Sequence, residues 1–321
     1  MGISRRSALK TMAVAGATAA GAAAATRSDA ASIPAPPPDA VGLLYDTTLC
    51  IGCKTCVVAC HEANDLKPDT RLSKGLWDMP VDLSGGTKNV IKLYKEADSP
   101  RRSYFKAQCM HCVDPACTSA CMLGSLKKDP KTGVVGYSPE YCVGCRYCSM
   151  ACPYEICRFQ FDEAAPKVVK CELCRHRVKD EAKKTASGYT RYPAGQGPAC
   201  AEVCPRGAVI YGRRDELLAE AKRRIAEHPE RYVGYAEGDP ARVFGETDGG
   251  GTQVLYLAHV PFEKLGLPDL GTEPVPHTAN VVQEGIYRGF VAPVALYAVL
   301  AGVLLRNRKA GESGAGKGGT P

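Results

Sequence analysis

Residues 142–153 read CVGCRYCSMACP, with Cys142, Cys145 and Cys148 at every third position and Cys152 four positions later, directly before Pro153. A short loop with a thiolate at every third residue can wrap three iron corners of a cubane 4Fe-4S cluster without straining the backbone. The trailing cysteine then points away at the start of a helix and can ligate a second cluster. This stretch therefore predicts one part of a two-cluster unit.

Related spacings occur four times and account for sixteen of the seventeen cysteines. Gly52 and Gly144 hold equivalent positions in the first and third groups, where glycine suits close approach of backbone N–H groups to sulfur. Each group contains four cysteines, so we predict four 4Fe-4S clusters as the cofactors. The groups are Cys50, Cys53, Cys56 and Cys60; Cys109, Cys112, Cys117 and Cys121; Cys142, Cys145, Cys148 and Cys152; and Cys171, Cys174, Cys200 and Cys204.

Two other uses of so many cysteines compete with iron–sulfur clusters. A disulfide framework is typical of exported domains, but it does not explain near-copies of one regularly spaced run. Structural zinc sites prefer two Cys-x2-Cys pairs to a triplet with a trailing fourth cysteine. Cys157 belongs to no group, and we expect it to be a small buried hydrophobe beside a cluster loop.

Composition indicates a globular protein, and the sequence motifs of an active site are not found in it. The 321 residues are 45% hydrophobic, and the formal net charge of +7 lies partly in the two ends of the chain. The basic residues of the body lack the interleaved aromatic residues of single-strand binders, so we predict no nucleic-acid partner. We find no nucleophile–base pair, Walker loop or Rossmann glycine fingerprint, so no catalytic residue is predicted.

Residues 1–30 have the layout of a signal peptide, with Arg5 and Arg6 before an Ala/Gly-rich and mildly apolar run. The arginine pair resembles a twin-arginine signal, which exports proteins already folded around a cofactor. Ala8 departs from that pattern, which usually has a large apolar residue there, and an ordinary secretory signal is the alternative. Residues 31–41 are proline-rich and are predicted to form an extended linker.

Residues 286–305 are predicted to form a transmembrane helix. The run from Gly289 to Leu305 carries no charge, and a span needs about 17 to 25 residues. Arg306, Arg308 and Lys309 follow at once, which predicts a cytoplasmic tail over residues 306–321 and a body on the periplasmic side. The alternative is a buried core helix.

We expect the body to be α+β, with two interleaved ferredoxin-like modules of two clusters each, in which metal binding supplies folding energy. Module A would comprise residues 42–108, with the first cysteine group and an insertion, together with residues 158–212. Module B would comprise residues 109–157. The insertion after Cys60 and the basic segment 175–199 have the polar composition of surface loops.

Residues 213–285 form a predicted C-terminal extension of the body. Its charged segment 215–227 carries apolar residues on one face, which predicts an amphipathic helix packed on the body. The glycines of 249–251 lead into an apolar run, which predicts a strand and not a phosphate-binding loop.

The chain as a whole resembles the iron–sulfur electron-transfer subunit of hydrogenase-2 type, membrane-bound nickel–iron uptake hydrogenases. The twin-arginine start, the four cysteine groups and the single C-terminal span match that family in order. The wider family includes the cluster subunits of formate dehydrogenase and of polysulfide and dimethyl sulfoxide reductases. The resemblance extends beyond the cysteines to LYD at 44–46, CMHCVDP at 109–115, LKKDPKTG at 126–133, CELC at 171–174 and GGTQV at 250–254.

The resemblance implies how the cysteines combine. It assigns Cys50, Cys53, Cys56 and Cys204 to cluster 1; Cys60, Cys171, Cys174 and Cys200 to cluster 2; Cys109, Cys112, Cys117 and Cys152 to cluster 3; and Cys121, Cys142, Cys145 and Cys148 to cluster 4. In both pairs the trailing cysteine crosses over to the neighbouring cluster.

The resemblance also implies partners and a location. The chain would be an electron-transfer subunit and not itself an enzyme. It would take electrons from the small and large subunits of a periplasmic nickel–iron hydrogenase and pass them to an integral membrane subunit that reduces quinone. It would lie on the periplasmic side of the bacterial inner membrane, anchored by its C-terminal helix. A cluster subunit of a molybdenum oxidoreductase, of the formate dehydrogenase or polysulfide/dimethyl sulfoxide reductase type, is the alternative.

Overall fold

The computed structural model describes residues 34–66, 80–97, 100–178, 197–282, 293–294 and 296–305. The chain divides into two units, one of residues 33–276 and one formed by the two ends of the chain, and each is described by itself. The predicted signal segment 1–30 and tail 306–321 lie outside the described residues, as does most of the basic segment 175–199.

A three-stranded sheet forms the centre of the first unit. Its strand order is β8 (Val209–Arg213), β1 (Val41–Asp46), β9 (Val254–Leu257). β1 runs antiparallel to β8 and parallel to β9. All four residues of β9 are buried, as are the last five of β1, because both faces of the sheet are covered. The predicted strand after the glycines at 249–251 is confirmed.

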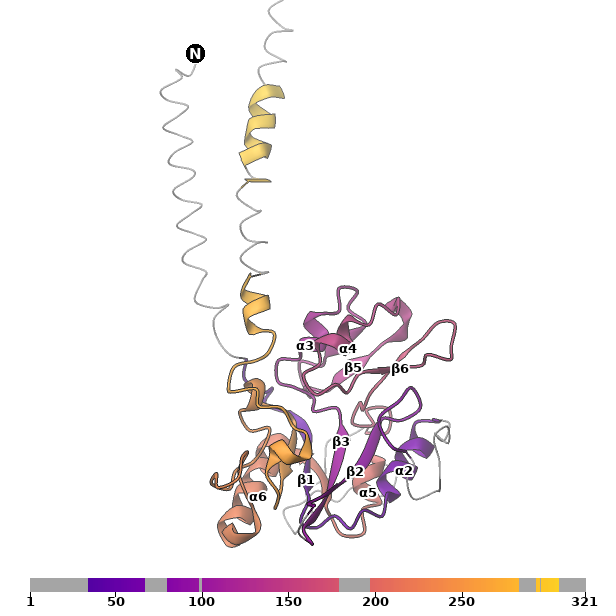
Figure 1. Cartoon of the computed structure of the whole chain (residues 1–321). Helices are drawn as coiled ribbons and strands as arrows, with labels where there is room; N and C mark the ends of the chain where they lie inside the picture. Colours follow the sequence, from indigo (N-terminus) through magenta and orange to yellow (C-terminus); the bar gives the residue numbers. More distant parts are fainter. Residues whose placement is uncertain are drawn as a thin grey trace, which may run out of the picture. The chain divides into compact units, whose positions relative to one another are not determined.

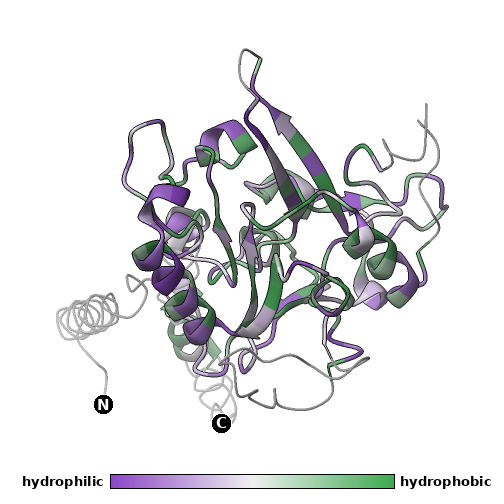
Figure 2. Cartoon of the chain, turned by 90° about the horizontal axis from the view of Figure 1, so that it is seen from below, coloured by the Kyte–Doolittle hydropathy of each residue, from purple (hydrophilic) through white to green (hydrophobic). Residues whose placement is uncertain are grey.

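Helix α6 (Arg214–Glu227) covers one face of this sheet. Leu217 and Ala221 pack with Leu44 of β1 and Leu255 of β9 in one apolar cluster. The amphipathic helix predicted over 215–227 is therefore confirmed. Figure 2 shows the same division by hydropathy, with largely green, hydrophobic strands at the centre of the body and purple, hydrophilic stretches on the outer helices.

The insertion after Cys60 differs from the expected surface loop. Its C-terminal part forms an antiparallel hairpin of β2 (Asn89–Lys95) and β3 (Arg102–Gln108). Val90, Phe105 and Ala107 are buried in the main apolar cluster, beside Tyr256 of the central sheet. The expectation was wrong for this part, because the first residues of β2 and the last residues of β3 are buried in the core, whereas the exposed polar residues lie toward the tip of the hairpin.

Short elements carry the cysteine loops. α2 (Thr55–Ala63) and α5 (Ala199–Glu202) pack against each other, and so do α3 (Ala116–Ser119) and α4 (Tyr147–Ala151). Two small hairpins, β4 (Leu126–Lys128) with β5 (Val135–Tyr137) and β6 (Arg158–Phe159) with β7 (Val168–Val169), complete this part. Single-turn helices lie at Pro139–Tyr141, Pro229–Arg231, Asp248–Gly250 and Phe262–Leu265.

The elements of the first unit gather in two groups (Figure 1). α3, α4, β5 and β6 lie at one end, and β1, β2, β3, α2 and α5 lie at the other. The β6–β7 hairpin follows the predicted module boundary at residue 157, yet Phe159 and Val168 pack with Cys117 and Cys148 of module B. These observations describe a mixed α/β body of small sheets, as expected for an α+β protein of ferredoxin-like type.

No helix among the described residues is both long enough and apolar enough to cross a membrane. The predicted span, residues 286–305, is described only at 293–294 and 296–305.

Candidate iron–sulfur cluster sites

The first and third cysteine groups adopt the same local backbone. Gly52 and Gly144 have φ values of 70° and 69°, and Lys54 and Arg146, which directly precede α2 and α4, have φ values of 59° and 67°. The alternation of left-handed residues bends the chain into a loop that brings its cysteines to one side. The Gly52 nitrogen lies 3.4 Å from Cys50 Sγ, and its N–H donates a hydrogen bond to this sulfur, as the glycine at this position predicts.

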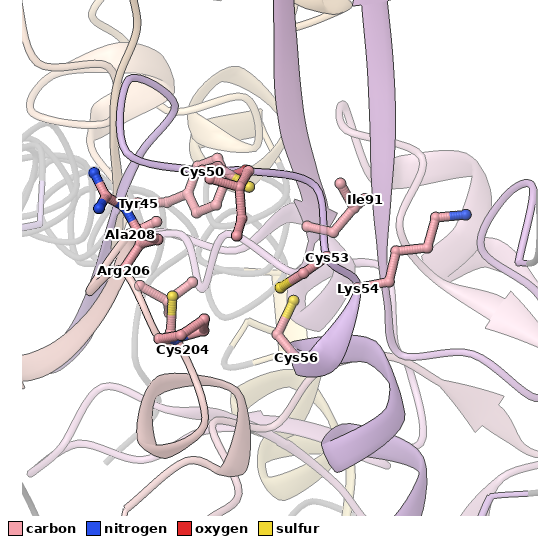
Figure 3. A pocket seen from close by; sticks show the side chains of 12 residues that line it. Tyr45, Cys50, Cys53, Lys54, Cys56, Ile91, Cys204, Arg206 and Ala208 are labelled. Atoms are coloured by element: carbon pink, nitrogen blue, oxygen red, sulfur yellow. The ribbon is translucent and has the colours of Figure 1, made fainter. Parts of the chain in front are cut away.

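Cys50, Cys53, Cys56 and Cys204 line one cavity. Cys204 comes from the segment between α5 and β8, far along the chain from the other three. In Figure 3 the side chains of Cys53 and Cys56 lie on one side of this space and Cys204 lies across from them, with Tyr45 and Cys50 nearby. The structure thus brings together all four cysteines assigned to cluster 1.

A second cavity is lined by Cys60, Cys171, Cys174 and Cys200. Asn64 and Gln108 also line it. Asn64 Nδ2 lies 3.6 Å from Cys60 Sγ and donates to it, whereas the buried Nε2 of Gln108 has no hydrogen-bond partner. An unpaired buried amide donor is costly, and sulfur atoms of a cluster in this cavity would give it acceptors. The cavity therefore fits a sulfur-rich group.

A third cavity is lined by Cys121, Cys142, Cys145 and Cys148, the cysteines assigned to cluster 4. Met122 and Val143, which also line it, are 81% and 73% exposed. Large apolar side chains of this kind on a surface frequently mark an interaction site.

The remaining four cysteines, Cys109, Cys112, Cys117 and Cys152, are close enough to influence one another electrostatically. Burial raises the pKa of Cys112 well above its usual value, and the thiolates of Cys109, Cys152 and Cys117 raise it further. Burial likewise raises the pKa of Cys109 to about 12, although the charge of Lys170 opposes the shift. Burial therefore favours the protonated thiol at Cys109 and Cys112, and iron that binds there must displace a proton.

Comparison with known proteins agrees with this donor set. Residues 101–214 match the family model of the 4Fe-4S dicluster domain. The hydrogenase-2 operon protein HybA of Escherichia coli O157:H7 is 39% identical over 295 residues, which cover 85% of this chain and 87% of HybA. This chain belongs to the HybA family. It is accordingly an iron–sulfur protein that carries 4Fe-4S clusters.

Iron–sulfur subunits of formate dehydrogenases are relatives of lower sequence identity. The iron–sulfur subunit of the nitrate-inducible formate dehydrogenase of Escherichia coli (strain K12) is 35% identical over 221 residues, which cover 68% of each chain. The formate dehydrogenase iron–sulfur subunit of Haemophilus influenzae is 33% identical over 222 residues, which cover 68% of this chain and 64% of that subunit. These relatives are iron–sulfur subunits of oxidoreductases, so the HybA-family chain is an electron-transfer protein and not a catalytic subunit.

All seventeen cysteines of this HybA-family chain lie among the described residues, and all are free thiols. The disulfide alternative is therefore wrong. Among the described residues, no three His, Cys, Asp or Glu side chains are arranged to hold a single metal ion. The thiolates of a cubane bind different iron atoms, so they lie farther apart than the ligands of one ion.

Cys157 is buried, as expected, with 1% of its surface exposed. Its thiol also lies beside Cys117, Cys148 and Cys152, which are assigned to clusters 3 and 4, and is placed to donate a hydrogen bond to one of them. The hydrogen bond from Cys157 lowers the pKa of Cys152 to about 6. Cys157 therefore favours the thiolate form of its neighbours. The sequence did not indicate this role, because Cys157 belongs to none of the four cysteine groups.

The sequence pattern did not indicate that two lysines are buried. Lys106, on β3, and Lys170, directly after β7, are 0% and 1% exposed. The only local signal is their place within three residues of a ligand cysteine, in runs that otherwise read as strands. His111 is also fully buried, and its Nδ1 accepts a hydrogen bond from the Val135 N–H at 3.0 Å.

Proposed function

We propose that this chain relays electrons through four 4Fe-4S clusters, from a periplasmic nickel–iron hydrogenase to a membrane subunit that reduces quinone. Three cavities, each lined by four cysteines from separate parts of the chain, carry this proposal. The 39% identity with a hydrogenase-2 operon protein supports the choice of hydrogenase. The ligand sets are those assigned to clusters 1 to 4 above.

A 4Fe-4S cluster supplies one-electron redox chemistry when bound. The chain itself binds the iron through its thiolates, donates backbone and amide N–H groups to sulfur, and excludes water from all but the rims of the sites. Cys53 and Cys145 are the only exposed cysteines among the seventeen. They belong to the sets of clusters 1 and 4, which supports these two as the points of electron entry and exit.

Electrostatic interactions between neighbouring ligand sets support the linear order of clusters 1, 2, 3, 4. Lys106 is close to Cys56 of set 1 and to Cys60 of set 2. Cys109 of set 3 is close to Cys171 of set 2. Cys117 of set 3 is close to Cys148 of set 4. Each ligand set therefore lies close to the next set in the order 1, 2, 3, 4.

The iron content of the chain tests the relay directly. Anaerobically purified protein should contain about sixteen iron and sixteen acid-labile sulfide per chain, with coupled reduced-cubane EPR signals after dithionite reduction. Protein with little iron and a full set of disulfides would overturn the proposal.

We further propose that residues 286–305 anchor the chain, with residues 1–30 as a twin-arginine signal that delivers the body to the periplasm. Removal of residues 286–321 should release the chain into the soluble periplasmic fraction with its clusters intact, because the body has its own core. Fractionation followed by iron analysis measures this. A matched deletion of only the tail after Lys309 should leave the chain in the membrane, and membrane retention of both variants would rule out the proposed anchor.

The second candidate is a cluster subunit of a molybdenum-dependent formate dehydrogenase. The 35% identity with formate dehydrogenase iron–sulfur subunits favours it. Affinity purification of the chain from its own membranes distinguishes the two functions. Nickel in the co-purified partner supports the hydrogenase, whereas molybdopterin supports the formate dehydrogenase.

A further inference from the structure

Lys106 and Lys170 are unusual among the described residues because a lysine is rarely fully buried without a paired anion. Neither ammonium group forms an ion pair with a carboxylate within 4 Å among the described residues. Lys106 Nζ donates a hydrogen bond to Oε1 of Gln108. Lys170 Nζ donates to the carbonyl oxygens of Val135 and, at 3.1 Å, Cys171. These neutral partners cannot neutralise a buried positive charge.

The neighbours that can neutralise these charges are the cysteines. Cys200, Cys56, Cys171 and Cys60 lie near enough to Lys106 to interact with its charge, and each would be a negatively charged thiolate when bound to iron. These residues belong to the ligand sets of clusters 1 and 2. The hydrogen bond to Gln108 supports the same placement, since Gln108 lines the cavity of cluster 2.

Lys170 is likewise buried beside cysteines, in this case those assigned to cluster 3. Cys109, Glu172 and Cys117 lie near enough to Lys170 to interact with its charge. Cys109 and Cys117 belong to the set of cluster 3. The backbone of Lys170 adjoins Cys171, so this lysine lies where the sets of clusters 2 and 3 meet.

We propose that Lys106 and Lys170 are fixed internal counter-charges of the relay, Lys106 for clusters 1 and 2 and Lys170 for cluster 3. A cluster held by four thiolates is negatively charged and gains a further negative charge on reduction. A nearby ammonium group in a dry interior stabilises the reduced form more than the oxidised form. Each lysine therefore holds the reduction potential of its clusters above the value that the ligands alone would give.

This inference rests on the proposed relay, and its test separates charge from hydrogen bonding. Lys106→Met removes both the charge and the donor, whereas Lys106→Gln retains a donor. EPR-monitored redox titration of the purified chain should show lower midpoint potentials for clusters 1 and 2 in both variants, with cluster 4 unchanged. Lys170→Met and Lys170→Gln should lower the potential of cluster 3.

Exposed lysines nearby provide matched controls. Lys92 lies opposite Phe105 on the β2–β3 hairpin and is partly exposed, in an ion pair with Asp82 at 2.9 Å. Lys167 is exposed and lies three residues before Lys170. Lys92→Met and Lys167→Met should leave every midpoint potential at the wild-type value, because solvent screens an exposed charge.

Unchanged potentials in Met and Gln variants that retain wild-type iron would overturn the inference and leave the relay intact. A shift in Met but not Gln would also overturn it, since hydrogen bonding alone would then explain the effect. If the Met and Gln variants lose iron, the iron content of Lys106→Arg and Lys170→Arg, which keep the positive charge, tests the inference instead. Iron retained in the arginine variants supports a counter-charge, and iron lost there as well contradicts it. Absence of clusters from the wild-type chain would instead overturn the proposed function.

Discussion

Replacement of Cys148 by alanine is expected to remove cluster 4 and to interrupt the relay. Iron should fall from about sixteen to about twelve per chain, because one of four cubanes is lost. Cys148 is 7% exposed and lies in the apolar cluster of module B, beside Leu126 and Phe159. Electron transfer from a reduced donor to a quinone-reducing partner should be nearly abolished, since cluster 4 is a terminal cluster of the proposed order.

Cys157→Ala provides the matched control for Cys148→Ala. Cys157 lies in the same apolar cluster, is also buried and has its thiol beside Cys148. Its replacement should retain about sixteen iron and most of the transfer rate. Iron and sulfide analysis with stopped-flow reduction measures both. Equal iron loss in the two variants would contradict the assignment of Cys148, and not Cys157, as a ligand.

Gly52→Ala is expected to damage cluster 1 through the backbone, without removing a ligand. Gly52 has a φ of 70°, and a Cβ at this position would lie 2.3 Å from Cε1 of the Tyr104 ring. The left-handed conformation costs a residue with a Cβ roughly 1 to 2 kcal/mol. Overpacking adds roughly 1 to 3 kcal/mol. The Tyr104 side chain or the loop must shift, so we expect a lower melting temperature and loss of the cluster 1 EPR signal.

Gly207→Ala separates these two costs. Gly207 also has a positive φ, of 63°, and follows Cys204 by three residues, but a Cβ there would meet no atom within 4 Å. This variant should show only the conformational cost and should keep all four clusters. Anaerobic thermal melts with iron analysis compare the two. Equal destabilisation would mean that contact with Tyr104 contributes nothing at Gly52.

The predictions that succeeded from sequence concern features that neighbouring residues produce. The three-residue spacing of Cys142, Cys145 and Cys148 is a property of one loop, and so is the need for glycine at Gly52 and Gly144. The helix over α6 follows from its own apolar periodicity, and the strand after Gly251 follows from its own apolar run. Such features need no knowledge of distant segments, because the backbone geometry of a few consecutive residues produces them.

Features that depend on distant contacts were decided by the tertiary structure. Cys204 joins the cavity of Cys50 because β8 pairs with β1, and β3 enters the core because the faces of its hairpin meet Tyr256 and the cysteine loops. The burial of Lys106 and Lys170 has no counterpart in local pattern, since a lysine in a strand usually marks a solvated face. The sequence by itself therefore determined which residues can bind clusters, through thiolate spacing along the chain. Only the tertiary structure decided which cysteines meet and which charges lie beside them, because burial and electrostatics depend on segments that are far apart in sequence.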